Sequence, residues 1–307
     1  MLRAMQSPST RRVFVTGGTG FVGREVVQAL RAAGCAVRCL VRRGSERDLH
    51  GLGAIERVEG DVMARQSLDE GMAGCDAVIH LVGIIRERPA IGATFERVHT
   101  QGTINVLEAA TAVGVRRYVH MSALGTRSGA RSRYHQTKWS AEEAVRAGPL
   151  PWTIFRPSII YGRGDGFVTL LAGMIERLPV VPVIGAGRQR LQPVPVAHVA
   201  QGFVRALALD ASVKHTYDVG GPEPLTMVDL VDRVAAAMGR RRPLKAHAPL
   251  GLVRAATRVL HRFPGYPLTP DQLLMLEEEN TCEPGAFYEA FGLVPLPLSA
   301  GLTAMLA

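Results

Sequence analysis

Short apolar runs alternate along the chain with longer segments in which apolar residues recur every three or four positions. The short runs predict strands at 13–16, 36–41, 55–59, 77–82, 118–122 and 152–156. Several of them are apolar on both faces, as strands covered by helices on each side are. Helical patterns lie between them at about 22–33, 95–113 and 134–147. This alternation predicts an α/β fold with a doubly wound parallel sheet.

The pattern changes after residue 156, where glycine and proline become frequent. We expect short strands at about 192–196 and 216–219, and helices at about 199–209, 227–238, 250–262 and 270–280. Thr226 and Thr269 are the expected N-caps of the second and fourth of these helices, and Pro270 a first helical residue. The chain is therefore predicted to form a larger domain of residues 11–157 plus about 192–220. A smaller, mostly helical substrate or partner domain takes about 158–191 and 221–307.

One strand runs through a glycine-rich turn directly into a helix, between Val13 and Gly23. Glycines allow a tight turn and let backbone N–H groups approach a pyrophosphate at the helix N-terminus. A glycine-rich connection without a ligand is the alternative, but the flanking strand and helix favour a dinucleotide. The larger domain is thus predicted to bind a dinucleotide. The expected contacts in the turn are Gly17, Thr19, Gly20, Phe21, Val22 and Gly23.

The end of the second predicted strand bears on which dinucleotide binds. A site that prefers NAD places Asp or Glu there, where it binds the ribose 2′-OH. This chain has Arg42 and Arg43, and its next acidic residue is Glu46. Guanidinium groups can bind a 2′-phosphate, so NADP(H) is the preferred cofactor and NAD(H) the alternative. The competing interpretation is two surface arginines, because 33 of the 36 Lys and Arg residues are arginine.

Tyr134 precedes Lys138 by four residues on a predicted helix, so the two side chains share a face. With three lysines and six tyrosines in the chain, chance would produce such a pair about 0.06 times. Ser122 ends the preceding predicted strand. We predict Tyr134 as general acid or base, and Lys138 as the cation that lowers its pKa and holds the nicotinamide ribose. Ser122 would hydrogen-bond the substrate oxygen. The alternative is an exposed helix pair and a strand-end hydroxyl.

These motifs resemble the extended or atypical short-chain dehydrogenase/reductase superfamily. The matching segments are Thr16 to Gly23, Gly60-Asp-Val, Leu81-Val-Gly and Tyr134-xxx-Lys138. Finer matches resemble the branch related to the NADPH-binding accessory subunit of respiratory complex I, and the resemblance extends from about residue 11 to 300. They are His80-Leu-Val-Gly-Ile, Tyr118-Val-His-Met-Ser-Ala-Leu-Gly, Trp152-Thr-Ile-Phe-Arg-Pro-Ser, Gln192-Pro-Val and Leu268-Thr-Pro-Asp-Gln-Leu-Leu.

The resemblance implies a Rossmann fold and further cofactor contacts. Asp61 and Val62 are expected near the adenine, and the segment Leu81, Val82 and Gly83 along the cofactor. Pro157 and Ser158 are expected near the nicotinamide.

The branch resemblance implies stable NADPH binding without fixing the reaction, and the set of Ser122, Tyr134 and Lys138 favours an oxidoreductase that acts on a carbonyl or quinone-like substrate. Two alternatives remain: a non-catalytic NADPH-binding accessory subunit of a respiratory complex, and a nucleotide-sugar epimerase/dehydratase. Nucleotide-sugar epimerases and dehydratases usually carry Asn at the position of Ser158 in this chain. They often have Val-Asn where this chain has Val98-His99. These departures weaken the nucleotide-sugar interpretation.

The composition of the 307 residues is that of an ordinary globular protein, with 47% hydrophobic and 21% charged residues. No uncharged apolar run approaches the roughly 18–20 residues of a membrane-spanning helix. Residues 1–12 lack the apolar core of a secretory signal. The four cysteines form no CxxC pair and the nine histidines no paired-ligand spacing, so neither disulfides nor a metal site is expected. A reducing cytoplasm is the expected compartment.

The net charge of +9 is unevenly distributed. Residues 233–262 hold eight Lys or Arg and no acid, whereas residues 263–307 hold six acids and no Lys or Arg. Arg254, Arg258 and Arg262 recur every fourth residue on a predicted amphipathic helix. Such a helix can contact the inner face of a membrane or a respiratory-complex partner. The ordinary alternative, which we expect, is that its apolar side packs on the core. Nucleic acid is not expected, because no basic stripe carries interleaved aromatic residues.

Overall fold

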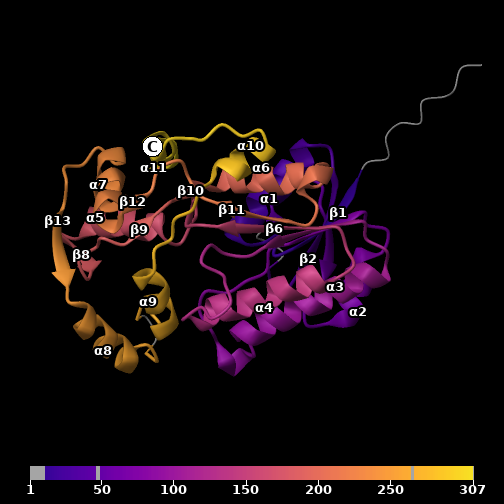
Figure 1. Cartoon of the computed structure of the whole chain (residues 1–307), viewed down its shortest axis with the longest axis horizontal. Coiled ribbons are helices and arrows are strands. Elements are labelled where there is room, and N and C mark those ends of the chain that lie inside the picture. The colour runs from indigo at the N-terminus through magenta and orange to yellow at the C-terminus, as the bar shows by residue number, and fades with distance from the viewer. Residues whose placement is uncertain (1–10, 46–48, 264–265, 307) are drawn as a thin grey trace, which may run out of the picture.

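A seven-stranded parallel sheet forms the centre of the computed structural model, which describes residues 11–45, 49–263 and 266–306 (Figure 1). The strand order is β11-β6-β5-β4-β1-β2-β3. The strands are β1 (Arg12–Thr16), β2 (Ala36–Val41), β3 (Glu56–Glu59), β4 (Ala77–His80), β5 (Arg117–Met121), β6 (Trp152–Pro157) and β11 (His215–Val219). The predicted doubly wound sheet is confirmed. The chain reverses its direction of winding between β3 and β4, so the carboxyl ends of β1 and β4 mark the switch point at which such sheets bind ligands.

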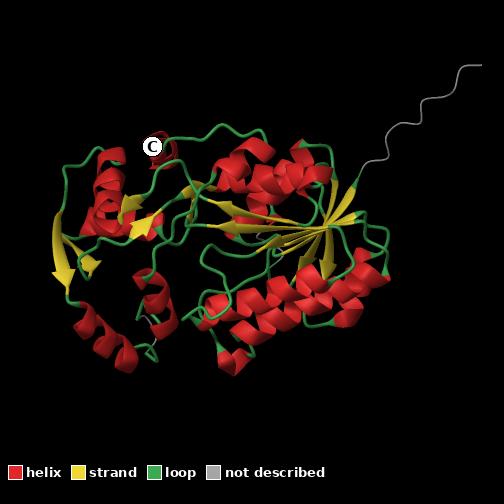
Figure 2. Cartoon of the chain, in the orientation of Figure 1, coloured by secondary structure: helices red, strands yellow, loops and turns green. Residues whose placement is uncertain are grey.

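Helices cover both faces of the sheet (Figure 2). One face carries α1 (Phe21–Ala32), α6 (Val196–Ala206) and α10 (Gly285–Ala290), and the other carries α2 (Arg65–Met72), α3 (Gly102–Ala112) and α4 (Arg133–Ala147). Alternate residues of β1 enter the two cores: Val13 and Val15 pack on the α1 side, and Phe14 on the α2 side. This two-sided burial explains why the strand reads as a continuous apolar run.

A third core lies to one side of the sheet and is built from α5 (Val168–Arg177), α7 (Met227–Ala237) and α11 (Leu298–Leu306). Three short strand pairs border it: β7 (Ile160–Tyr161) with β10 (Val194–Pro195), β9 (Arg190–Leu191) with β12 (Leu225–Thr226), and β8 (Val180–Ile184) with β13 (Leu244–Ala248). Below them in Figure 1 lie α8 (Leu250–Leu260) and α9 (Pro270–Glu277). The short segments η2 (Pro89–Ile91), η3 (Glu96–Gln101) and η4 (Asp210–Ser212) complete the elements.

The predicted elements agree with the structure best where the apolar pattern is strong. Each expected strand of residues 13–156 is present within two residues, and both Thr226 and Thr269 form capping boxes. The pattern missed α2, α5, α10, α11, the short strands β7, β9 and β12, and the β8–β13 pair. The helix expected at 95–113 instead begins as the π-helical segment η3 before it continues as α3. The division into two domains stays a prediction.

Helix α8 differs from what its sequence suggested. Its apolar side chains were expected to pack on the core, but Leu252 and Val259 are 66% and 65% exposed. The expectation was wrong for these side chains, because α8 packs on its neighbours through another side, where Thr257 is buried and Val253 and Ala256 are half-buried. In the described part of the chain, no helix combines the length and the apolar character that crossing a bilayer requires.

Candidate active site

The turn between β1 and α1 can only be built from glycines at two positions. Gly17 has a φ of 77°, and a Cβ there would lie 3.0 Å from the carbonyl carbon of Leu81. A Cβ on Gly23 would lie 2.1 Å from the carbonyl oxygen of Gly17. No side chain caps the N-terminus of α1 at Gly20. Its first N–H groups are therefore suited to a pyrophosphate, as the sequence predicts.

A cavity of about 210 Å³ opens beside this turn at the switch point of the sheet. Nine predicted cofactor contacts line it: Gly17, Thr19, Gly20, Arg42, Asp61, Val62, Leu81, Val82 and Gly83. Five lining residues were not predicted: Leu40, Gly60, Ile84, Ala93 and Val98. Leu40 and Gly60 adjoin predicted residues and could have been inferred, whereas Ala93 and Val98 reach the cavity through a loop that no pattern marks. The lining is suited to a dinucleotide, because the backbone is exposed at its glycines.

The two arginines after β2 differ in their placement. Arg42 lines the cavity, and its guanidinium has no hydrogen-bond or ion-pair partner within 11–45, 49–263 and 266–306. The side chain of Arg43 is 90% exposed and lies 3.9 Å from Glu59. Only Arg42 is therefore positioned at the cavity wall.

Tyr134 and Lys138 both come from the first turns of α4, and Lys138 reaches the cavity wall. Its Nζ lies 3.1 Å from the position that a Cβ on Gly83 would occupy, and it donates a hydrogen bond to the carbonyl of Met121 at 3.0 Å. Ser122 follows Met121 directly and is buried, with its Oγ 3.4 Å from the Oγ1 of Thr126. The structure thus joins the lysine to the carboxyl end of β5, beside the cavity that the glycine turn forms.

The NAD dependent epimerase/dehydratase family model matches residues 13–220, which is more than half of the chain. The chain belongs to this family. It is 31% identical over 277 residues to the mitochondrial NADH dehydrogenase (ubiquinone) 1 alpha subcomplex subunit 9 of Arabidopsis thaliana, and the match covers 87% of this chain and 68% of that protein. It is 36% identical over 200 residues to the ceramide reductase of Caulobacter vibrioides, covering 64% of this chain and 60% of the reductase.

Among solved structures, the chain resembles the dTDP-glucose 4,6-dehydratase DesIV from Streptomyces venezuelae with NAD bound. The TM-score is 0.75 at 21% identity, and the match covers 96% of each chain. This likeness concerns the fold. The family therefore accounts for the glycine turn, the seven-stranded sheet and the cavity at its switch point.

The epimerase/dehydratase fold holds Tyr134 in an apolar pocket. Its ring lies edge-on to Phe95, with centroids 5.8 Å apart, and edge-on to His99, with centroids 5.2 Å apart. Burial and the nearby carboxylate of Asp271 raise the pKa of Tyr134 to about 12. Burial also lowers the pKa of Lys138 to about 8, against an opposing effect of Glu142. In the protein alone, the lowering of the Tyr134 pKa by Lys138 that the sequence suggested is not found, because burial and Asp271 both raise this pKa.

His99 is a neighbour of the site that the sequence did not predict. Its Nδ1 lies 2.9 Å from the Oγ1 of Thr137, and its Nε2 lies 3.0 Å from the backbone of Ile84 at the cavity. Burial and the charge of Lys138 hold the pKa of His99 well below its usual value, so it is neutral. The only signal in the sequence was that His99 occupies a position where relatives often have Asn.

A row of buried, hydrogen-bonded side chains leads from β1 to His99. His80 lies between the Oγ1 of Thr16, at 2.6 Å, and the Oγ1 of Thr103, at 3.1 Å. Thr103 in turn donates to the carbonyl of His99 at 2.6 Å. Burial lowers the pKa of His80 to about 3, so these hydrogen-bonded side chains carry no charge at neutral pH. These contacts connect β1 and β4 to the helix that carries His99.

The two residues expected at the nicotinamide lie at the end of β6, outside the lining of the cavity. Pro157 ends the strand, and the Ser158 hydroxyl donates to the side chain and backbone of Asn280. Phe21, Val22 and Gly23 lie in the first turn of α1, beside the cavity turn. The segment after α9 therefore engages the hydroxyl through which Ser158 would contact a ligand.

Acidic residues of the C-terminal segment contact the loop and helix that carry Tyr134. The carboxylate of Asp271 accepts hydrogen bonds from the backbone N–H groups of Arg133, at 2.7 Å, and Tyr134, at 3.1 Å. Arg127 forms an ion pair with Glu278 at 2.9 Å. The first turn of α4 is thus capped by α9, an element far away in the sequence.

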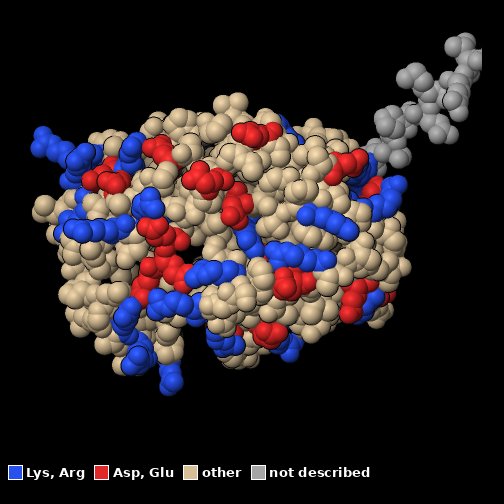
Figure 3. Space-filling model, viewed as in Figure 1, with Lys and Arg blue, Asp and Glu red and all other residues tan. Residues whose placement is uncertain are grey.

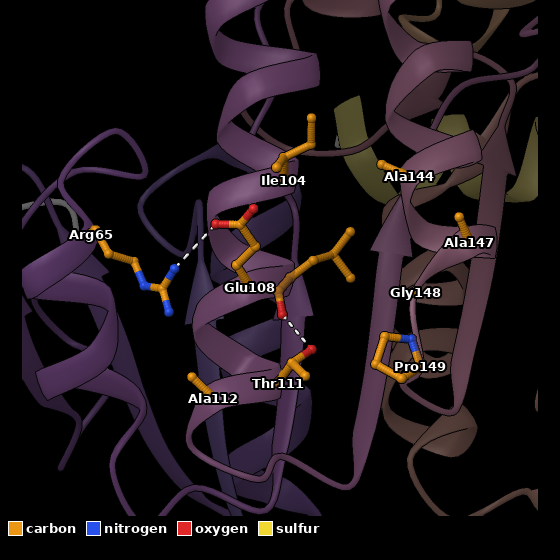
Figure 4. Close-up of a pocket in the computed structure, with 10 residues that line it drawn as sticks. Arg65, Ile104, Glu108, Thr111, Ala112, Ala144, Ala147, Gly148 and Pro149 are labelled. Atoms are coloured by element: carbon orange, nitrogen blue, oxygen red, sulfur yellow. Dashed lines mark hydrogen bonds and ion pairs between the residues drawn. The ribbon is translucent and has the colours of Figure 1, made fainter.

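A larger hollow of about 520 Å³ lies away from the site, between α3 and α4 (Figure 4). It is open and lined mainly by short or apolar side chains, with Arg65 and Glu108 paired at 3.2 Å on one side. None of the predicted site residues lines it. No group of three or more potential metal ligands is present among the described residues.

Proposed function

We propose that the protein is an NADPH-dependent oxidoreductase that reduces a carbonyl or quinone-like group, with Tyr134 as the proton donor. One observation carries the proposal: Lys138, one helical turn after Tyr134 on α4, packs against Gly83 in the wall of the dinucleotide cavity. A bound nicotinamide cofactor supplies the hydride. The carbonyl carbon receives that hydride, and its oxygen receives the proton of the Tyr134 hydroxyl.

The protonation state of Tyr134 is compatible with a proton donor. Burial and Asp271 raise the pKa of its phenol to about 12, so the hydroxyl is protonated at neutral pH. Lys138 donates a hydrogen bond to the Met121 carbonyl and packs on Gly83, so its ammonium group lies at the cavity wall, where it would hold the nicotinamide ribose. Ser122 lies beside Met121 and supplies a hydroxyl for the carbonyl oxygen.

The preference for NADPH rests on Arg42. Its guanidinium lies at the cavity wall after β2, and Leu40, which lies in the same wall, offers no acidic group for a ribose 2′-OH. A free guanidinium at this position attracts a 2′-phosphate through charge-assisted hydrogen bonds. Arg43 contributes less, because it is exposed and faces Glu59.

The relatives suggest two uses of such a site. One is named a ceramide reductase, which supports an amphiphilic carbonyl substrate for this chain. The other is named a subunit of NADH dehydrogenase, which supports a second candidate function as an NADPH-binding subunit without turnover. A nucleotide-sugar substrate is less well supported, because Ser158 is engaged by Asn280.

A direct experiment separates these functions. The nucleotide that copurifies with the protein is identified, and NADPH oxidation is followed with ceramide-like ketones, quinones, simple ketones and nucleotide sugars. We expect turnover with an amphiphilic carbonyl and a loss of about 10²–10⁴ in kcat for Tyr134→Phe, with NADPH affinity retained. Tyr217→Phe is the matched control, because the Tyr217 hydroxyl makes no hydrogen bond with the described residues.

Two outcomes would contradict the proposal. Turnover that is equal in the Tyr134→Phe variant and in the control would exclude the proton-transfer role. NADPH that binds tightly but is never oxidised with any of the substrates would favour the accessory-subunit function.

A further inference from the structure

Helix α8 presents its apolar side to the surface of the molecule. Leu252, Val259 and Phe263 are 66%, 65% and 60% exposed. At about 100° per residue, Leu252 and Val259 project within about 20° of one another and form one strip along the helix, and Phe263 follows three residues beyond its end. Apolar strips of this kind are normally turned towards the core of a protein.

Another side of α8, with the half-buried Val253 and Ala256 and a polar edge, makes the contacts with the rest of the protein. Thr257, the buried residue of α8, lies 3.0 Å from the hydroxyl of Tyr266. Arg254 forms an ion pair with Glu277 of α9 at 2.5 Å. Because hydrogen bonds and an ion pair hold this edge, the apolar strip is left without a partner in the described part of the molecule.

Free positive charges flank the strip. Arg258 and Arg262 are exposed, and their side chains have no hydrogen bond or ion pair with any residue of 11–45, 49–263 and 266–306. No acidic residue occurs between residues 233 and 262. Figure 3 shows basic side chains at the lower edge of the molecule, over α8, while acidic side chains gather above α9. An apolar strip with a basic flank matches the interface of a bilayer that contains anionic lipids.

We propose that α8 docks the protein on an anionic phospholipid membrane. Leu252, Val259 and Phe263 enter the headgroup region, and Arg258 and Arg262 contact lipid phosphates. A second copy of the chain is a poorer occupant of this surface. A two-fold interface would bring the unpaired arginines of two copies together, where like charges repel.

Docking through α8 places the membrane next to the proposed catalytic site. The guanidinium of Arg86, six residues after β4, donates to the carbonyls of His261 and Tyr266, at the end of α8 and just beyond it. Asp271 of α9 holds the first turn of α4 at Tyr134. The helix that contacts lipid is therefore connected, through two short segments, to the site where an amphiphilic carbonyl would be reduced. The membrane binding itself does not depend on the proposed reaction.

Vesicle flotation with the full chain tests this docking. Vesicles of phosphatidylcholine alone are compared with vesicles that also contain phosphatidylglycerol, at low and high salt. We expect binding to the anionic vesicles only, weakened by salt. The variant Leu252→Gln/Val259→Gln should lower the partition coefficient at least about ten-fold, because it removes the apolar strip while Gln keeps the helix propensity. Arg258→Gln/Arg262→Gln should lower it by about ten-fold as well.

The matched control is Ile91→Gln/Val294→Gln, which changes two apolar residues that are 73% and 83% exposed outside α8. Its binding should equal that of the unmodified protein, and circular dichroism should find all variants equally folded. Three outcomes would overturn the proposal: no binding to anionic vesicles, binding that the α8 variants do not reduce, or an equal reduction by the control. A lipid-free dimer that the Leu252→Gln/Val259→Gln variant dissociates would assign the strip to a second copy instead.

Discussion

At the scale of single residues, the positions of Arg42 and Arg43 separate two side chains that the sequence treats alike. Both follow β2, but only Arg42 lines the cavity, whereas Arg43 points to solvent beside Glu59. The difference arises because consecutive residues after a strand point in different directions. A cofactor phosphate could therefore reach one guanidinium more easily than the other.

This difference predicts how each arginine affects cofactor choice. Arg42→Gln should weaken NADPH binding about ten-fold or more and leave NADH binding unchanged, because a charge-assisted hydrogen bond to the 2′-phosphate is lost. Arg43→Gln is the control and should change NADPH affinity much less. Fluorescence titration of both nucleotides measures the effect. If NADH binds the unmodified protein more tightly than NADPH, the assignment of Arg42 is wrong.

Asp271 acts on Tyr134 in two ways, by capping α4 and by raising the pKa of the phenol. Asp271→Asn should lower the pKa of Tyr134, because a negative charge disfavours the phenolate, and the amide oxygen keeps one of the two backbone hydrogen bonds. Ultraviolet titration of the phenolate measures this change, with Tyr134→Phe identifying the signal.

Asp229→Asn is the control for that titration, since the Asp229 carboxylate also accepts a backbone hydrogen bond at a helix N-terminus, from Thr226 in the capping box of α7. Its phenolate titration should not differ from that of the unmodified protein. An unchanged Tyr134 pKa in the Asp271→Asn variant would mean that the carboxylate has no electrostatic effect on the phenol.

At the scale of elements, the turn between β1 and α1 depends on close backbone packing. Gly23→Ala would place a methyl group 2.1 Å from the Gly17 carbonyl oxygen and 2.7 Å from the Gly18 Cα. Backbone atoms cannot move aside as a flexible side chain can, so we expect the variant to lose NADPH binding. It should also be destabilised by about 1–3 kcal/mol in urea denaturation.

Gly173→Ala provides the opposite control within a helix. Gly173 lies inside α5, and a methyl group added there would have no atom from outside the helix backbone within 4 Å. Alanine should therefore stabilise the protein by about 0.5–1 kcal/mol and leave NADPH binding unchanged. Wild-type NADPH affinity in Gly23→Ala would show that the turn does not approach the cofactor as closely as we infer.

At the scale of the whole molecule, the uneven charge becomes a set of contacts between distant segments. Acidic residues after residue 263 pair with arginines from several parts of the chain: Glu277 with Arg254, Glu278 with Arg127 and Glu279 with Arg190. Among the described arginines of the basic segment 233–262, Arg254 pairs with this acidic segment. The rest of its positive charge is therefore not neutralised by the C-terminal acids.

The ion pair of Glu277 predicts a pH-dependent contribution to stability. Its hydrogen bond with Arg254 lowers the pKa of Glu277, so the contribution is complete above the unfolded value of about 4.3 and is lost as the pH falls through the folded pKa. The carboxylate is only 7% exposed, but its arginine partner is 51% exposed and screened by water. Glu277→Gln should therefore cost about 1 kcal/mol at neutral pH and much less near pH 3.

Glu279→Gln tests whether burial decides this cost. Its pair with Arg190 has a similar length of 3.0 Å, but both side chains are more than half exposed, so we expect a smaller loss. Urea denaturation at the two pH values measures both variants, and hydrogen exchange of α8 reports whether the helix loosens. Equal losses from the two variants would contradict the role of burial.

The sequence by itself determined the sheet and most of the cofactor cavity. Strands buried on both faces read as continuous apolar runs, and the glycine turn is local, so residues 13–23 reveal it without the rest of the chain. Helices α2 and α5 were missed because neither has a side-chain N-cap, whereas the equally short α9 is marked by Thr269 and Pro270.

Only the tertiary structure decided what surrounds Tyr134 and what α8 presents to the surface. Asp271 and His99 meet Tyr134 from segments far apart in the chain, and no local pattern encodes such a meeting. The apolar strip of α8 has the same sequence whether it faces the core or the solvent. Its direction depends on which edge of the helix has partners, and here the polar edge contacts Glu277 and Tyr266. Local periodicity records which residues share a face, whereas packing determines where that face points.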